Sequence, residues 1–238
     1  MTIDEASKIR GANYLSAGAA GAREMWQAYD RNLIERDLER AAKLKLNTLR
    51  VMLSYEYWLV EKGRLENSIY HLAQTAWSQH KIRILPVLFD CTMETLQQFE
   101  DPAKWFAIED FVNWFMQRWA HEHRLVALEV VNEPQGVTQF KFARAMLART
   151  ARMRKSLPLT FGARKLEDSR LMQDLGLDLL QVHIDGAYDE AAVRNILDDA
   201  AATQEILGRP VLVVGLRSGL SVPESYPLGV IHQTFELS

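Results

Sequence analysis

The sequence alternates short apolar runs with longer segments of helical periodicity, and this alternation constrains the fold more than any other feature. Strands that alternate with helices form a parallel sheet with right-handed crossovers. Eight strands favour a closed (β/α)₈ barrel over an open doubly wound sheet. The predicted strands are 9–14, 47–53, 82–89, 126–131, 159–161, 179–184, 211–214 and 229–232, and the predicted helices are 34–45, 66–79, 108–121, 138–155, 166–175 and 189–207.

Length and spacing predict one domain. The chain has 238 residues, 48% of them hydrophobic, and barrels of this class commonly occupy about 250 residues. No repeat, linker or low-complexity tract divides the sequence, so residues 1–238 are predicted to form a single TIM barrel. The segment between Gly215 and Gly229 has room only for a short helix or a loop, and six residues follow His232. A shortened or missing last helix is therefore expected.

Charge and composition exclude several classes of partner. The net charge of -3 and pI near 6.1 give no attraction to nucleic acid or to an anionic membrane, and no apolar run reaches the ~20 residues of a membrane span. The single cysteine, Cys91, excludes an internal disulfide and favours a reducing compartment. We expect a cytoplasmic protein, or a secreted one if a signal peptide has been removed. Nothing in the sequence specifies an oligomeric state.

Cofactor and metal motifs are absent from the sequence. There is no glycine-rich phosphate loop and no Gly-x-Ser-x-Gly nucleophile elbow. His121-Glu122-His123 lacks a third ligand at a recognisable spacing, so a metal site is not expected. We therefore predict that the protein uses no cofactor and no metal.

The tripeptide Asn132-Glu133-Pro134 follows the apolar run 125–131 and is the strongest functional signal. Pro134 cannot continue a sheet ladder, so Glu133 is placed at the carboxyl end of the fourth strand, where α/β barrels keep their chemistry. Burial and a neighbouring carboxylate would raise the pKa of Glu133, as a general acid requires. A role as an ordinary turn residue near a strand end is the alternative.

Parity along the fourth strand predicts which side chains enter the barrel. Glu129, Val131 and Glu133 alternate with Leu128 and Val130, so the first three are expected to point inward. A buried Glu129 needs a partner. Arg50 on the second strand is the candidate for that partner.

The segment "LEVVNEP", from Leu128 to Pro134, resembles the acid/base segment of clan A glycoside hydrolases, among which family 5 cellulases and mannanases are the most similar. The resemblance implies that Glu133 is the acid/base and that Asn132 binds a sugar hydroxyl. Further segments resemble the other strands of that family: "GANY", "LNTLRV" with Arg50, "KIRILPVLFD", "DLLQVHID" and "RPVLVVGLRSG". In the sixth of these strands His183 matches a substrate-site histidine, and Asp185 stands where a tyrosine often follows.

The seventh segment departs from the family pattern. Gly215 or Leu216 stands where the nucleophile glutamate is expected, and neither carries a carboxylate. The late tryptophan that serves as a sugar platform has no match. Asp90 and Asp185 lie near other strand ends and could supply a second carboxyl group, which an inverting enzyme needs ~6.5–9.5 Å from the first. A capping or loop role for these acids is the alternative.

Aromatic residues and the histidine leave two interpretations open. Tyr55 and Trp58 follow the second strand and could stack on a sugar ring or pack against the barrel top. His183 could line the site or be a structural core histidine. The predicted function is hydrolysis of O-glycosyl bonds in a β-linked oligo- or polysaccharide. The alternative is a catalytically inactive barrel that binds carbohydrate or a protein partner in the barrel cleft.

Overall fold

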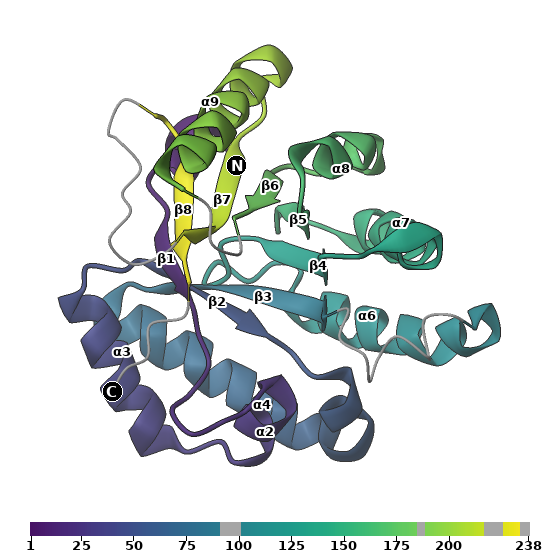
Figure 1. The fold of residues 1–238 in the computed structure, drawn as a ribbon. Helices are drawn as coiled ribbons and strands as arrows, with labels where there is room; N and C mark the ends of the chain where they lie inside the picture. The colour runs from purple at the N-terminus through teal and green to yellow at the C-terminus, as the bar shows by residue number, and fades with distance from the viewer. Residues whose placement is uncertain (91–100, 185–188, 217–225, 234–238) are drawn as a thin grey trace.

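The protein is a single parallel barrel (Figure 1). The computed structural model describes residues 1–90, 101–184, 189–216 and 226–233. Hydrogen-bonded neighbours follow the order β5-β4-β3-β2-β1-β8-β7-β6, and every pair is parallel. All eight predicted strands are confirmed: β1 Arg10–Asn13, β2 Thr48–Met52, β3 Arg83–Asp90, β4 Leu128–Asn132, β5 Leu159–Gly162, β6 Leu180–His183, β7 Val211–Leu216 and β8 Gly229–His232.

The seam between β5 and β6 is closed by separate backbone hydrogen bonds instead of a regular ladder. Leu179 N donates to Leu159 O at 3.3 Å, and His183 N donates to Ala163 O at 2.8 Å. Between these two bonds the N–H of Gln181 donates to the buried hydroxyl of Ser169 at 3.1 Å. A side chain from the following helix therefore satisfies a donor that a ladder would otherwise use.

Helices form the outer layer of the barrel (Figure 1). All six predicted helices are present, with bounds that differ by a few residues except at α4, which begins about three turns earlier than predicted. The Ser54 hydroxyl accepts from the N–H of Tyr57 and caps α4, and a non-helical Glu61 marks a kink inside it. The helices are α1 Ile3–Ser7, α2 Ala22–Gln27, α3 Arg31–Lys43, α4 Tyr55–His80, α6 Trp105–Trp119, α7 Gly136–Met153, α8 Leu166–Leu171 and α9 Glu190–Leu207, with 3-10 turns at Pro102–Lys104 and Gln173–Leu175.

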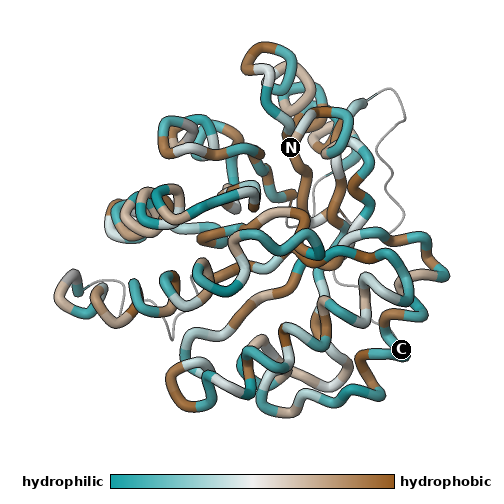
Figure 2. The backbone as a smooth tube through the Cα atoms, turned by 180° about the vertical axis from the view of Figure 1, so that it is seen from behind, coloured by the Kyte–Doolittle hydropathy of each residue, from teal (hydrophilic) through white to brown (hydrophobic). Residues whose placement is uncertain are grey.

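Two buried clusters hold the fold together. The larger lies between the strands and the outer helices, and the smaller lies inside the barrel and includes Leu85, Leu179 and Leu212. Ala6 of the short helix α1 belongs to the inner cluster, so α1 covers the amino-terminal end of the barrel. In Figure 2 the strands at the centre are mostly hydrophobic, and the helices around them mix hydrophobic and hydrophilic residues.

The end of the chain agrees with the predicted shortening as far as the structure describes it. Residues 226–228, before β8, contain no helix, and Gln233 after β8 is not helical. The rest of the segment before β8, 217–225, and residues 234–238 lie outside the described ranges. None of the helices in the described ranges is long and apolar enough to cross a membrane.

Gly162 at the end of β5 gives a test of the barrel interior. A Cβ at this position would lie 2.2 Å from Oε1 of Glu129 and 3.2 Å from the Cα of Asn132. We expect Gly162→Ala to lower the free energy of unfolding by about 1–3 kcal/mol, because the buried carboxylate has no space to retreat. Urea unfolding measures the change. Gly63→Ala is the control, since nothing lies within 4 Å of its new methyl group and alanine favours a helix interior. Equal effects would contradict the steric explanation.

Candidate functional site at the carboxyl ends of the strands

A buried ion pair lies at the centre of the site. Arg50 of β2 donates from Nε to Oε2 of Glu129 at 2.7 Å, and from Nη2 to Oε1 at 2.6 Å. The Arg50 side chain is 3% exposed and that of Glu129 is fully buried. The predicted partnership of these two residues is therefore confirmed. Two parallel hydrogen bonds make this the strong, planar form of the arginine–carboxylate contact.

The same guanidinium positions two amide side chains. Arg50 Nη1 donates to Oδ1 of Asn13 at 2.9 Å, and Nη2 donates to Oδ1 of Asn132 at 2.7 Å. Asn132 in turn donates from Nδ2 to Oδ1 of Asp90 at 3.0 Å. Because its carbonyl faces a cation and its NH₂ faces an acid, the Asn132 amide has one orientation that suits both neighbours.

The predicted alternation along β4 fails after Glu129. The register shifts between Glu129 and Asn132, and Val131 joins the cluster that packs against the outer helices. Asn132 faces the interior in its place, where it contacts Arg50. An irregularity of this kind re-aims side chains near a site, and here it places Asn132 and Glu133 together at the barrel mouth.

Glu133 occupies a strained position just past β4. Its φ of 45° lies in the left-handed region, which costs a residue with a Cβ on the order of 1 kcal/mol. Its N–H donates to Gly162 O at 2.8 Å. The side chain, 15% exposed, accepts from Arg164 Nε at 2.9 Å through Oε2 and lies 2.6 Å from Nδ1 of His183 through Oε1.

Gln181 links the buried ion pair to this histidine. Its Nε2 donates to Oε2 of Glu129 at 3.2 Å, and its Oε1 lies 3.1 Å from Nε2 of His183. The ion-paired Glu129 can only accept, so Gln181 must present its NH₂ to it and its oxygen to His183. Nε2 of His183 is then a donor. The remaining bond between Nδ1 and Glu133 must hold a further proton, carried either by the imidazole or by the carboxyl group.

The surroundings shift the pKa values of Arg50 and Asp90 from their ordinary values. Burial by itself would lower the pKa of Arg50, but the charge and hydrogen bonds of Glu129 outweigh it and raise that pKa. Burial raises the pKa of Asp90, and the hydrogen bond from Asn132 and the charge of Arg50 only partly oppose it. Arg50 is thus a permanent cation, while Asp90 takes up a proton more readily than an exposed aspartate.

Arg50, Asp90, Asn132, Glu133 and His183 therefore share one hydrogen-bonded arrangement. Asp185 lies outside the described residues. The two β7 positions at which the sequence resemblance predicts a nucleophile are Gly215, with a φ of 86°, and Leu216, which is 1% exposed. Neither offers an acid at the mouth.

The two aromatic candidates are buried in the first turn of α4. Tyr55 and Trp58 are 3% and 9% exposed, and both rings pack against Phe111 of α6. In this structure their contacts are those of a packed aromatic cluster between helices. Residues 91–100, which follow β3, lie outside the described ranges, so the surroundings of these rings are described only in part.

Sequence reasoning did not identify Asn13, Arg164 or Gln181 as members of the site. The parity of β6 contains a signal for Gln181, because His183 lies two residues further on the same face. Asn13 ends β1 and could have been found as a polar residue at a strand end. Arg164 follows β5 after two small residues and has no pattern of its own. Among the described residues no group of three or more histidines, cysteines or acids could hold a metal ion.

No protein-family model matches the sequence, and no curated protein matches it significantly. Solved structures with a similar fold include an endo-1,4-beta-mannanase from Eisenia fetida, with a TM-score of 0.67 and 14% identity over 94% of this chain and 83% of that one. An endo-beta-1,4-glucanase from Bacillus halodurans has a TM-score of 0.69 and 13% identity over 98% of this chain, which spans 56% of its length.

A family 5 glycoside hydrolase variant from Streptomyces cattleya, solved with Manb1-4GlcNAc, has a TM-score of 0.62 and 14% identity over 94% of this chain and 70% of that one. At these identities the likeness establishes the fold. The chain has the TIM-barrel fold of these family 5 structures.

Removal of one charge from the buried pair should be costly. Glu129→Gln keeps the size of the side chain but leaves Arg50 as an unpaired buried cation. We expect the free energy of unfolding to fall by about 3–5 kcal/mol, measured by urea unfolding. Glu190→Gln, which removes an exposed pair with Arg194 at 3.4 Å, should change it by less than about 1 kcal/mol. Similar losses in both variants would contradict the central role of the pair.

The raised pKa of Asp90 predicts a pH-dependent stability. Above the unfolded value of about 3.9, the native state holds a proton on Asp90 that the unfolded state releases, so stability falls as pH rises through the raised native pKa. Asp90→Asn removes this loss. The stability of the variant relative to the unchanged protein should therefore increase with pH from about 4 upward, in unfolding measured at several pH values. A pH-independent difference would contradict this.

Proposed function

We propose that this barrel, with the fold of family 5 glycoside hydrolases, binds a carbohydrate at the carboxyl ends of its strands and hydrolyses a glycosidic bond with Glu133 as the acid/base. One observation supports this more than any other. Glu133 is a strained residue at the mouth whose Oε1 lies 2.6 Å from Nδ1 of His183 and whose Oε2 accepts from Nε of Arg164 at 2.9 Å. Strain of this kind accumulates at functional sites.

A leaving sugar oxygen needs a proton, and in this proposal the hydrogen bond between Glu133 and His183 supplies it. In the proposed step the proton passes from the Glu133 carboxyl group to the glycosidic oxygen as the bond to the anomeric carbon breaks. His183 keeps the proton available because its other nitrogen is committed to Gln181. Arg164 favours the carboxylate that remains after transfer.

Asp90 is the described carboxyl group best placed to activate the water. It pairs with Asn132 across the β3–β4 ladder, so its strand neighbours β4, at a strand spacing of roughly 4.8 Å, and Glu133 directly follows β4. In the proposed step the Asp90 carboxylate takes a proton from water while the water oxygen bonds to the anomeric carbon. Its raised pKa, caused by burial, makes it a stronger base than an exposed aspartate.

Binding without hydrolysis is a second candidate function, and β7 favours it. Gly215 has no side chain and Leu216 is buried, so neither β7 position offers the second carboxyl group of the family pattern. In this reading the polar side chains at the mouth bind sugar hydroxyl groups or a protein partner. The carbohydrate complex of a structural neighbour, the Streptomyces cattleya enzyme with Manb1-4GlcNAc, is consistent with a sugar ligand in either reading.

Turnover of aryl β-glycosides separates the two candidates. We expect the unchanged protein to hydrolyse at least one member of a panel of aryl β-glucosides, β-mannosides and β-galactosides, and Glu133→Gln to reduce kcat by roughly 10²–10⁴, the usual contribution of a general acid. Asp90→Asn should reduce kcat in the same way if Asp90 activates the water. Glu205→Gln, an exposed acid near the far end of α9, should leave the rate unchanged.

Two other results would contradict hydrolysis or the carbohydrate function as a whole. Absence of turnover across the panel, together with saturable binding of β-linked oligosaccharides that Glu133→Gln weakens, would replace hydrolysis by binding. Absence of both turnover and oligosaccharide binding would overturn the proposed carbohydrate function altogether.

A further inference from the structure

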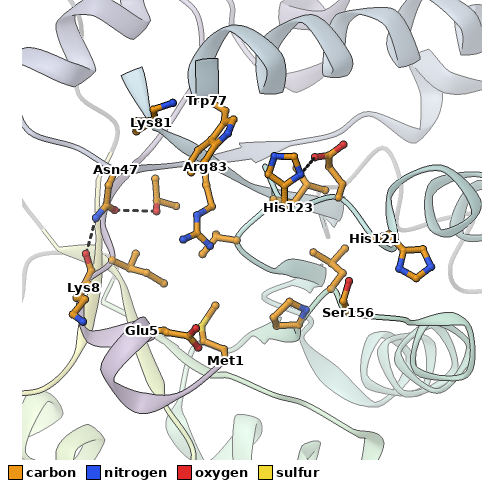
Figure 3. A pocket seen from close by; sticks show the side chains of 17 residues that line it. Met1, Glu5, Lys8, Asn47, Trp77, Lys81, Arg83, His121, His123 and Ser156 are labelled. Atoms are coloured by element: carbon orange, nitrogen blue, oxygen red, sulfur yellow. Dashed lines mark hydrogen bonds and ion pairs between the residues drawn. The ribbon is translucent and has the colours of Figure 1, made fainter. Parts of the chain in front are cut away.

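A cavity opens at the amino-terminal end of the barrel, the end opposite Glu133. Figure 3 shows this cavity from close by. Its volume is about 670 Å³, and it is lined by residues of the amino-terminal segment around α1, among them Glu5 and Lys8, and by residues that begin or precede β2, β3, β4 and β5. Arg83, the first residue of β3, lines the cavity, whereas Asp90, the last residue, belongs to the candidate carbohydrate site. Asp90 lies seven residues further along this extended strand, or roughly 23 Å from Arg83. The two sites are therefore independent in space.

A tight turn from α4 into β3 brings an aromatic ring and two cations together on one wall. Lys81 ends α4 in the left-handed conformation, with a φ of 59°, and its N–H donates to the carbonyl groups of Ala76 and Trp77. Nζ of Lys81 lies 5.2 Å from the ring centre of Trp77, and the Arg83 guanidinium carbon lies 5.9 Å from it. Figure 3 shows Trp77 and Arg83 beside the open space.

The acids that line this cavity are already engaged. Glu122 accepts from Nε of Arg124 at 2.8 Å and from its backbone N–H at 3.0 Å. Glu5 accepts from the Thr2 N–H at 2.7 Å, and hydrogen bonds from Thr2 are the main cause of its lowered pKa, with Arg83 the smallest contributor.

Lys81 and Arg83, in contrast, form no ion pair with any acid in the described part of the chain. His121 and His123 also line the cavity, and Nδ1 of His123 lies 3.4 Å from Oε1 of Glu122. Glu5 keeps its charge, because its hydrogen bonds come from the neutral groups of Thr2, and it is a weak electrostatic neighbour of Arg83. The wall therefore carries two cations that form no ion pair within the described residues.

We propose that this cavity binds a small oxyanion-bearing molecule, a phosphate ester or a carboxylate, through Arg83 and Lys81. The planar guanidinium of Arg83 presents paired donors that fit a phosphate or carboxylate group, and Lys81 adds a mobile point charge. The cavity volume lies in the range of small-molecule pockets, so the cavity has room for the rest of the molecule that carries the anionic group. Trp77 forms a flat wall beside the group attached to the anion. The two cations near its ring hold the ring in place.

Isothermal titration with pyrophosphate and, separately, with citrate tests this directly. We expect saturable binding of at least one of them to the full chain, weaker at high salt because exposed charges are screened. Arg83→Gln should reduce the affinity roughly tenfold or more, since it removes a charge-assisted pair of hydrogen bonds. A preference for pyrophosphate assigns the site to phosphate compounds, and a preference for citrate assigns it to carboxylates.

Two variants separate binding from stability. Lys81→Gly removes the second cation at a left-handed position where glycine is the favoured residue, so the barrel should be no less stable while the affinity falls. Arg64→Gln is the control, because Arg64 is an exposed cation of the same helix, about 20 Å from Trp77 along its axis. It should bind as the unchanged protein does.

Two results would contradict the proposed anion site. Absence of saturable binding of either anion at low salt would overturn the proposed site, as would equal losses in Arg83→Gln and Arg64→Gln. Oligosaccharide binding or glycosidase turnover at the other end of the barrel should be unaffected by Arg83→Gln and Lys81→Gly. Loss of anion binding with retained sugar binding therefore distinguishes this site from the carbohydrate site.

Discussion

The buried pair of Arg50 and Glu129 is the interaction on which the rest of the site depends. A charge in the middle of a barrel is tolerated only if it is paired and its remaining hydrogen-bonding groups are satisfied. The surrounding residues meet that requirement: Asn13 and Asn132 accept from the guanidinium, and Gln181 donates to the carboxylate. The absence of a side chain at Gly162 leaves space for the carboxylate itself.

The consequences of this pair reach the barrel mouth as a sequence of hydrogen bonds. Glu129 determines which end of Gln181 faces it, Gln181 determines which nitrogen of His183 donates to it, and the other nitrogen of His183 lies 2.6 Å from Glu133. Each step follows from the donors and acceptors that a side chain possesses. A buried ion pair is thereby connected through hydrogen bonds to an acid at the barrel mouth, and this links the stability of the barrel to its proposed chemistry.

The two ends of the barrel differ in how their charges are arranged. At the carboxyl ends acids and cations alternate in contact, which suits neutral, hydroxyl-rich ligands and proton transfer. At the amino ends the acids are occupied by neighbouring donors and two cations remain beside an aromatic wall. The two ends of one parallel barrel are thus chemically distinct, because different residues stand at the start and at the finish of its strands.

The sequence by itself determined the eight-stranded barrel, the pairing of Arg50 with Glu129 and the position of Glu133 at the end of the fourth strand. These follow from local periodicity and from the cost of an unpaired buried charge, both of which are visible in residue order. Only the tertiary structure decided that Asn132 replaces Val131 in the interior, that Arg164 and Gln181 join the site, and that cations gather around Trp77. Those features depend on a shifted register, a left-handed backbone and contacts between strands far apart in the chain, none of which has a local pattern.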